Sequence, residues 1–196
     1  MFSAEFQDFA THAAANLYPT GLRPEIDSLN EWIYDQINNG VYRAGFARSQ
    51  RAYDRAVRLL FEGLDRVEDI LSRRRYLAGS QLTEADVRLF TTLVRFGAVY
   101  VTHFKCNVRR IVDSPNTWGY VCDIYALPGV AETVNMFHLK HHYFESHRSL
   151  NPTGIVPAGP EIDFAAPHDR ARLAFGLNFL LDMARRSKVS PAARGF

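Results

Sequence analysis

The apolar residues of this chain recur at intervals of three and four positions, and we find no extended run of strand-like alternation. The clearest stripes lie in residues 21–39 and 49–74. Because an α-helix repeats every 3.6 residues, this spacing lines one face of a helix with apolar side chains. The sequence therefore predicts an all-α fold in which these two segments are amphipathic helices.

A helix start is marked by the segment Thr83-Glu84-Ala85-Asp86. Threonine followed three residues later by an acidic residue is the spacing of a capping box, in which each end residue hydrogen-bonds to the backbone of the other. Leu82 and Val87 flank it as a hydrophobic staple would require. The residues that follow are apolar on more than one side, which indicates the central buried helix of a bundle.

Further helices are expected where apolar residues and helix-start signals recur, at 116–126, 128–134, 137–147 and 171–187. Pro115 and Pro128 stand where proline can begin a helix. Residues 151–167 are rich in proline and glycine and predict an extended segment along the surface. The picture is of six to eight helices with an extended tail segment.

Charge and cysteine usage exclude several classes of function. The formal net charge is only +2, and cations concentrate after residue 168, which is a poor electrostatic match to nucleic acid. The two cysteines lack CxxC spacing and favour a reducing compartment. No apolar run reaches the length of a membrane span, and no signal peptide is evident. We expect a cytoplasmic protein with a helical domain over 1–168 and a basic extension over 169–196.

The densest group of titratable residues surrounds Tyr143 and consists of His138, His141, His142 and His147. His138 and His142 would share a helix face, but the sequence gives this pair no third ligand, so we predict no metal site. Three tyrosines are other candidates for chemistry, namely Tyr42, Tyr100 and Tyr143. A phenol can donate a hydrogen bond to an anion or pass a proton, yet each of these tyrosines is equally compatible with a role in the core.

Five segments, read in order, resemble the C-terminal domain of glutathionyl-hydroquinone reductases, the xi-class glutathione transferases. They are IYDQINNGVYRAGFARSQRAYDRAV, RRRYLAGSQLTEADVRLFTTLVRF, VYVTHFKCNVRRI, PGVAETVN and SHRSLNPTGIVPAGP. The resemblance runs from about Met1 to His168, and the phrases VTHFKCN and NPTGIVP are its most specific parts. It implies the helical bundle of a glutathione transferase C-terminal domain with an extended Pro/Gly-rich tail segment.

The resemblance also implies a site. In that family a thioredoxin-like domain binds glutathione, the co-substrate, and carries a nucleophilic cysteine in a Cys-Pro-Trp-Ala motif. The matching motifs make Tyr42 the proton donor and acceptor for an aromatic substrate, and Tyr100 and Tyr143 the donors that stabilise the cysteine thiolate. The resemblance further implies a homodimer.

Some residues depart from the family pattern. Gly97 and Ala98 stand where the family commonly has aspartate and proline, and Phe137 stands where aspartate is usual. Cys106 matches a second cysteine of the family that is separate from its nucleophile, and Cys122 is expected to be a buried helix residue. These substitutions predict a pocket of altered shape.

No Cys-Pro-Trp-Ala motif occurs in these 196 residues. We therefore expect a truncated or separately encoded helical half that turns over little or no substrate alone and relies on a thioredoxin-like domain in cis or in trans. The alternative is a non-catalytic interaction or ligand-binding module of the same fold.

Overall fold

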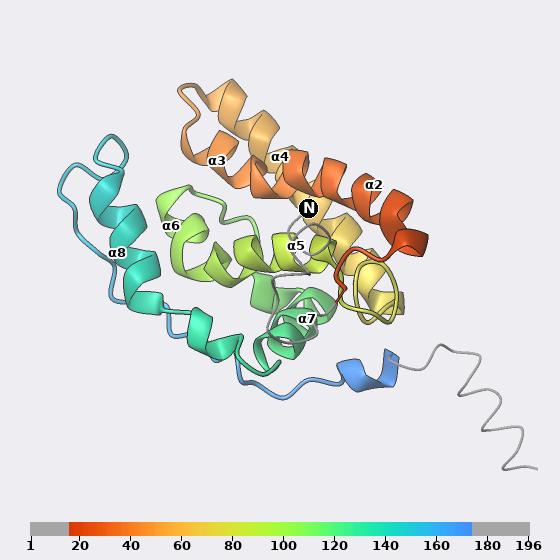
Figure 1. Cartoon of the computed structure of the whole chain (residues 1–196). Helices are drawn as coiled ribbons and strands as arrows, with labels where there is room; N and C mark the ends of the chain where they lie inside the picture. Colours follow the sequence, from red (N-terminus) through yellow and green to blue (C-terminus); the bar gives the residue numbers. More distant parts are fainter. Residues whose placement is uncertain (1–15, 174–196) are drawn as a thin grey trace, which may run out of the picture.

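A computed structural model describes residues 16–173, and the regular structure in that range is helical apart from one bridge between Tyr76 and Gly79 (Figure 1). This confirms the predicted all-α fold. The α-helices are α2 (Arg23–Ile33), α3 (Gly40–Gly45), α4 (Gln50–Arg73), α5 (Glu84–Arg95), α6 (Val101–His103), α7 (Pro115–Tyr125) and α8 (Met136–Ser146). Two π-helical turns and four 3-10 turns complete them, at Tyr34–Asn38, Phe96–Tyr100, Thr20–Leu22, Ile111–Asp113, Ala131–Thr133 and Arg170–Leu173.

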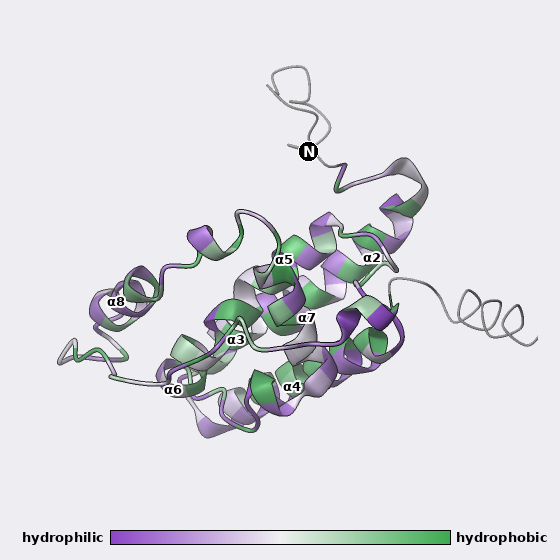
Figure 2. Cartoon of the chain, turned by 90° about the horizontal axis from the view of Figure 1, so that it is seen from below, coloured by the Kyte–Doolittle hydropathy of each residue, from purple (hydrophilic) through white to green (hydrophobic). Residues whose placement is uncertain are grey.

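Helix α5 lies in the middle of the bundle, with α2, α3 and α4 on one side and α7 on the other (Figure 1). Coloured by hydropathy, the helices turn apolar residues inward and polar residues outward (Figure 2). The long helix α4 shows why, since Leu60, Leu64, Val67 and Leu71 recur every three or four residues and are all buried. Burial of such stripes supplies most of the stability of an amphipathic helix.

Most predicted helices lie where the periodicity placed them, but the segment 128–134 is a correction. Pro128 lies in a turn instead of starting a helix, and only Ala131–Thr133 forms a single 3-10 turn. Gly129 adopts a positive φ of 83°, a conformation that a continuing right-handed helix cannot contain. The predicted helix over 171–187 lies largely outside the described residues.

The capping box at the start of α5 is confirmed, and it is more extensive than the local spacing indicates. The buried Asp86 carboxylate accepts hydrogen bonds from the Thr83 N–H at 2.8 Å and from the Leu77 N–H at 2.9 Å. The Tyr120 hydroxyl on α7 donates to the same carboxylate at 3.0 Å. Asp86 therefore connects the start of α5 to the preceding loop and to the neighbouring helix.

The predicted extended segment is confirmed: residues 151–167 form no helix and run from α8 toward α7 (Figure 1). Phe164 is buried and packs beside Trp118 and Tyr125 of α7, with ring centroids 5.7 and 5.3 Å apart. Ile162 approaches Gly97 so closely that a Cβ on the glycine would lie 2.9 Å from its Cδ1. The absence of a side chain at Gly97 therefore lets residues 151–167 pack closely against this part of the bundle.

Arg170, predicted to belong to the basic extension, is only 1% exposed and packs into the helical domain. Its guanidinium donates to the carbonyl oxygens of Leu71, Arg74 and Arg75, which lie at the carboxyl end of α4. These carbonyls have no partner within the helix, so the arginine acts as a cap from a distant part of the chain. Residues 174–196 of the predicted extension lie outside the described structure.

Candidate functional site

The three candidate tyrosines meet at one place although they come from distant parts of the chain. Tyr42 lies on α3, Tyr100 ends the π-helical turn Phe96–Tyr100, and Tyr143 lies on α8. The Tyr143 hydroxyl oxygen is 2.7 Å from that of Tyr42 and 2.9 Å from that of Tyr100. The fold therefore builds a chain of three hydrogen-bonded phenols.

The order of these hydroxyls determines which proton is available to a bound molecule. Three phenols carry three protons, and the two hydrogen bonds between them use two. Tyr100 is 2% exposed, and its hydroxyl is hydrogen-bonded to that of Tyr143, whereas Tyr42 is 36% exposed. Donation from Tyr100 to Tyr143 and from Tyr143 to Tyr42 thus leaves the Tyr42 proton free to face outward.

Both inner phenols are held in the protonated form. Burial and the hydrogen bond to Tyr143 raise the pKa of Tyr100 far above its ordinary value. Burial raises the pKa of Tyr143 to about 12, although the hydrogen bond from Tyr100 and the charge of Arg95 partly lower it. At neutral pH these groups therefore remain hydrogen-bond donors.

A buried aromatic ring supports the phenols from behind. Phe104 stacks on Tyr100 with a centroid separation of 5.4 Å and an interplanar angle of 10°. Its ring also lies 5.2 Å from that of Tyr42. Gly45 makes room for this ring, because a Cβ there would lie 2.2 Å from a ring carbon of Phe104. The site thus depends on a small residue in α3.

The phenols open onto a cleft of about 500 Å³ between α3, α5 and the end of α8. Its lining includes polar residues that no sequence motif points to, chiefly Asn38, Arg88 and Arg95. Asn38, in the π-helical turn after α2, donates to the Thr92 hydroxyl at 2.6 Å and so ties that turn to α5. A π-helical turn often marks a functional site, but no local spacing predicts one here.

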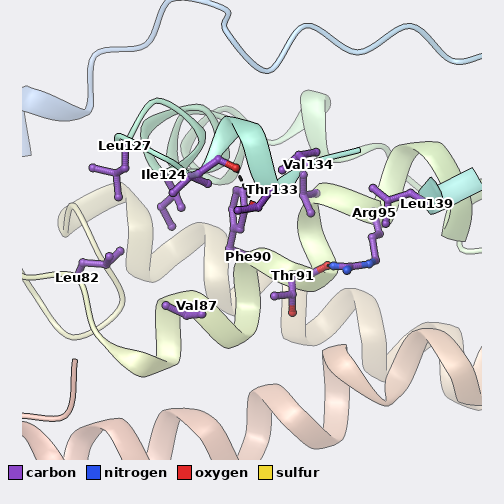
Figure 3. Close-up of a pocket in the computed structure, with 12 residues that line it drawn as sticks. Leu82, Val87, Phe90, Thr91, Arg95, Ile124, Leu127, Thr133, Val134 and Leu139 are labelled. Carbon is purple, nitrogen blue, oxygen red and sulfur yellow. Dashed lines mark hydrogen bonds between the residues drawn. The ribbon is translucent and has the colours of Figure 1, made fainter. Parts of the chain in front are cut away.

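A second, more apolar pocket of about 240 Å³ lies between α5 and the segment that joins α7 to α8 (Figure 3). Its wall includes Phe90, Val94, Ile124 and Leu139. Thr91 and Arg95 line both this pocket and the tyrosine cleft. The two cavities are therefore neighbours along α5.

Neither cysteine is placed to act as a nucleophile. Cys106 is fully buried, and burial raises the pKa of its thiol to about 12. Cys122 lies in α7 and is 1% exposed, which confirms the predicted buried helix residue, and burial raises the pKa of its thiol to about 11. Since the thiolate is the reactive form, neither thiol is activated at neutral pH.

The histidines around Tyr143 are arranged differently from the suggested pair of His138 and His142. The contact in the structure joins His103, which the sequence did not single out, to His147, with Nε2 and Nδ1 3.2 Å apart. Among residues 16–173 no three potential metal ligands gather at one place. Burial and the nearby His147 lower the pKa of His103 to about 4, and burial also lowers the pKa of His147.

This histidine pair predicts a loss of stability in mild acid. The ordinary pKa of histidine is 6.5, so the unfolded chain takes up a proton at His103 before the folded chain does. Stability therefore falls as the pH drops below 6.5 and levels off below about 4, with a loss of about 2 kcal/mol between pH 7 and pH 5. Urea unfolding at pH 7 and at pH 5 measures this difference in the free energy of unfolding.

The matched controls for this test are single substitutions to asparagine. His103→Asn should unfold with a clearly smaller difference between pH 7 and pH 5 than the unsubstituted chain. His138→Asn, at an exposed position of α8, should keep the full difference. An unchanged pH dependence in His103→Asn contradicts the assignment.

Both the sequence and the fold of this chain are similar to those of known proteins. Residues 50–121 match the family model described as glutathione S-transferase, C-terminal domain. The chain is 57% identical over 170 residues to glutathionyl-hydroquinone reductase YqjG of Escherichia coli K12, covering 87% of this chain and 52% of that protein. It is 54% identical over 143 residues to glutathionyl-hydroquinone reductase PcpF of Sphingobium chlorophenolicum, covering 73% of this chain and 46% of that protein.

A solved structure agrees with these relatives. The xi-class glutathione transferase of Natrialba magadii superposes with a TM-score of 0.85 at 51% identity, covering 88% of this chain and 53% of that one. The chain thus spans about half the length of the curated relatives that it matches. No helix in residues 16–173 is long and apolar enough to cross a membrane. The described residues have the helical fold of the glutathione S-transferase C-terminal domain, and most of the chain is homologous to the corresponding part of glutathionyl-hydroquinone reductases.

Proposed function

We propose that this chain supplies the ring-binding, proton-donating half of a glutathionyl-hydroquinone reductase site. A thioredoxin-like domain, in cis or in trans, would supply the reactive thiolate and most of the glutathione contacts. The observation that carries the proposal is the chain of phenol hydroxyls from Tyr100 through Tyr143 to Tyr42 at the edge of a cleft. The homology to reductases of this name supports the choice of substrate class.

The proposed reaction begins with the thiolate of the partner domain attacking the sulfur of the glutathionyl group. A sulfur–sulfur bond forms, the bond from sulfur to the ring carbon breaks, and the ring carbon takes the electron pair together with a proton from Tyr42. A second glutathione then attacks the mixed disulfide through its thiolate, releasing glutathione disulfide and the cysteine thiolate. The thiol proton of that glutathione restores the Tyr42 phenol, so hydroquinone and glutathione disulfide are the products.

Tyr100 and Tyr143 would assist in two ways. Both remain protonated at neutral pH, so Tyr143 can donate a hydrogen bond to the incoming thiolate when its contact with Tyr42 opens, and Tyr100 can do so when its contact with Tyr143 opens. While the contact between Tyr42 and Tyr143 is closed, the hydrogen bond from Tyr143 orients the Tyr42 hydroxyl. Donors to the charged form of a thiol lower its pKa and increase the reactive fraction.

We further propose that the assembly is a cytoplasmic homodimer in which partner surfaces cover the exposed apolar residues. Tyr34 lines the tyrosine cleft and is 58% exposed, which suits a contact with the thioredoxin-like domain. Phe137 on α8 is 64% exposed. Two free buried cysteines are consistent with a reducing compartment.

The test is reduction of a glutathionyl-hydroquinone with excess glutathione, followed by chromatography of the released hydroquinone. The purified chain alone should show no turnover above the uncatalysed rate. A chimera that joins the uncovered half of the E. coli relative to this chain should turn over. Its Tyr42→Phe variant should lose about 100-fold in kcat, the usual contribution of a general acid. Tyr125→Phe, on α7 beside Phe164, is the matched control and should keep full activity.

Each outcome separates the alternatives. Turnover by the chain alone would mean that one of its own cysteines is the nucleophile. Equal rates for the chimera and its Tyr42→Phe variant would reject the role of Tyr42. A folded chimera that binds hydroquinone without turnover would favour a non-catalytic ligand-binding module.

A further inference from the structure

We propose that Arg95 makes the tyrosine cleft selective for ring substrates that carry an anionic substituent, such as a carboxylate. This inference rests on the proposed function of the cleft and names the class of ring that the cleft prefers. Arg95 would act as a specificity-determining residue, since its guanidinium would contact the substituent and not the reacting atoms.

The charges that line the cleft all have the same sign. Among residues 16–173, Arg88 and Arg95, two turns apart on α5, are its only charged lining residues, and no carboxylate of this range lines it. The remaining lining side chains are phenols, amides and threonines, which donate hydrogen bonds as readily as they accept them. A negative group that enters this cleft meets attraction and no repulsion from its walls.

The two arginines differ in whether their charge is already compensated. Arg88 forms an ion pair with Glu84 one turn earlier in α5, at 2.5 Å. No carboxylate of residues 16–173 lies within ion-pair distance of Arg95. Arg95 therefore carries the uncompensated charge of the cleft.

Only part of the hydrogen-bonding capacity of the Arg95 guanidinium is used within the described residues. One of its terminal nitrogens donates to the Thr91 carbonyl oxygen on the preceding turn. The other N–H groups make no hydrogen bond within the described residues. A planar guanidinium that is anchored on one side can bind a carboxylate with two parallel hydrogen bonds, which an ammonium group cannot reproduce.

The surroundings of Arg95 strengthen such a contact. Arg95 is half-buried, and it borders the apolar pocket as well as the tyrosine cleft (Figure 3). Apolar walls exclude water and reduce the screening between opposite charges. The charge of Arg95 also lowers the pKa of Tyr143, so its field reaches the phenols beside which the ring would lie.

The test compares two rings that differ in charge and hardly in shape, 2,5-dihydroxybenzoate and 2,5-dihydroxybenzamide. Isothermal titration of the purified chain with each gives the ratio of the two dissociation constants. We expect the benzoate to bind about fivefold more tightly, as one ion pair with a half-buried arginine would give. Raising the salt concentration should reduce this preference.

Two substitutions at Arg95 and one elsewhere locate the effect. Arg95→Met should abolish the preference by raising the dissociation constant of the benzoate. The dissociation constant of the benzamide should change by no more than about twofold, as expected when only a charge contact is lost. Arg95→Lys should restore part of it, because the charge returns without the planar fork. Arg58→Met, at an exposed position of α4, is the control and should keep the full preference.

Four results would overturn the inference. Equal affinities for the two rings in the unsubstituted chain would reject the selectivity and leave the ring-binding function standing. A preference that survives Arg95→Met would assign it to another residue. Glutathione itself carries carboxylates and is the third test ligand. If it competes with the benzoate, and if Arg95→Met weakens glutathione as much as it weakens the benzoate, Arg95 binds a carboxylate of glutathione. Failure of either ring to bind would reject the ring-binding cleft itself.

Discussion

Replacing Asp86 by alanine should lower the free energy of unfolding by about 4 kcal/mol, because buried donors without a partner cost roughly 1–3 kcal/mol each. The carboxylate is fully buried and accepts hydrogen bonds from Leu77, Thr83 and Tyr120. Its removal leaves two backbone N–H groups away from water with nothing to accept their hydrogen bonds. Urea denaturation followed by circular dichroism measures the change.

The control for Asp86 is its neighbour Glu84, which is also acidic and lies in the first turn of α5. Glu84→Ala loses only a surface ion pair with Arg88 and should cost no more than about 1 kcal/mol. Asp86→Asn fills the same volume but turns an NH₂ group toward backbone donors. Its loss of stability should therefore lie between those of Glu84→Ala and Asp86→Ala. A cost below about 1 kcal/mol for Asp86→Ala would contradict the role of this network.

Arg170→Ala should destabilise the domain by about 3 kcal/mol, since hydrogen bonds from a charged group are worth roughly 1.5–3 kcal/mol each and burial of the charge offsets part of them. The side chain donates to three carbonyl oxygens at the end of α4. Burial lowers the pKa of the Arg170 guanidinium, which reflects the cost of keeping this charge away from water. Thermal and urea unfolding of the variant measure the loss.

Arg172 provides the matched control for Arg170. It is exposed, lies two residues further along the chain and pairs with Asp169 at 2.7 Å. Arg172→Ala should change stability by no more than about 0.5 kcal/mol. The stability of Arg170→Lys should lie between those of Arg170→Ala and Arg172→Ala, because an ammonium group keeps the charge but cannot span three separated acceptors. Equal stability of the two alanine variants would show that Arg170 does not hold the end of α4.

The helices could be predicted from the sequence because their signals are local. The stripe in α4 and the capping box of α5 both depend on residues only three or four positions apart. The helical hydrogen bond joins residues at the same separation, so spacing alone reveals such an element. The exception at Pro128 is also local in origin, since the positive φ of Gly129 interrupts a pattern that otherwise permits a helix.

The candidate site was only partly predictable. Tyr42, Tyr100 and Tyr143 were selected by resemblance to a family, and their periodicity alone is equally compatible with core positions. Their contact depends on the π-helical turn that ends at Tyr100, because one extra residue in a turn rotates every later side chain around the helix axis. No residue pattern in the sequence indicates that turn.

The sequence by itself determined the helical content, the start of α5 and the extended course of residues 151–167. Only the tertiary structure decided that Tyr143 contacts both Tyr42 and Tyr100, that His103 faces His147, and that Arg170 caps α4. The physical reason is the range of the forces involved. Helix formation is controlled by neighbours within one turn, whereas these contacts join residues more than forty positions apart and exist only after the helices have packed.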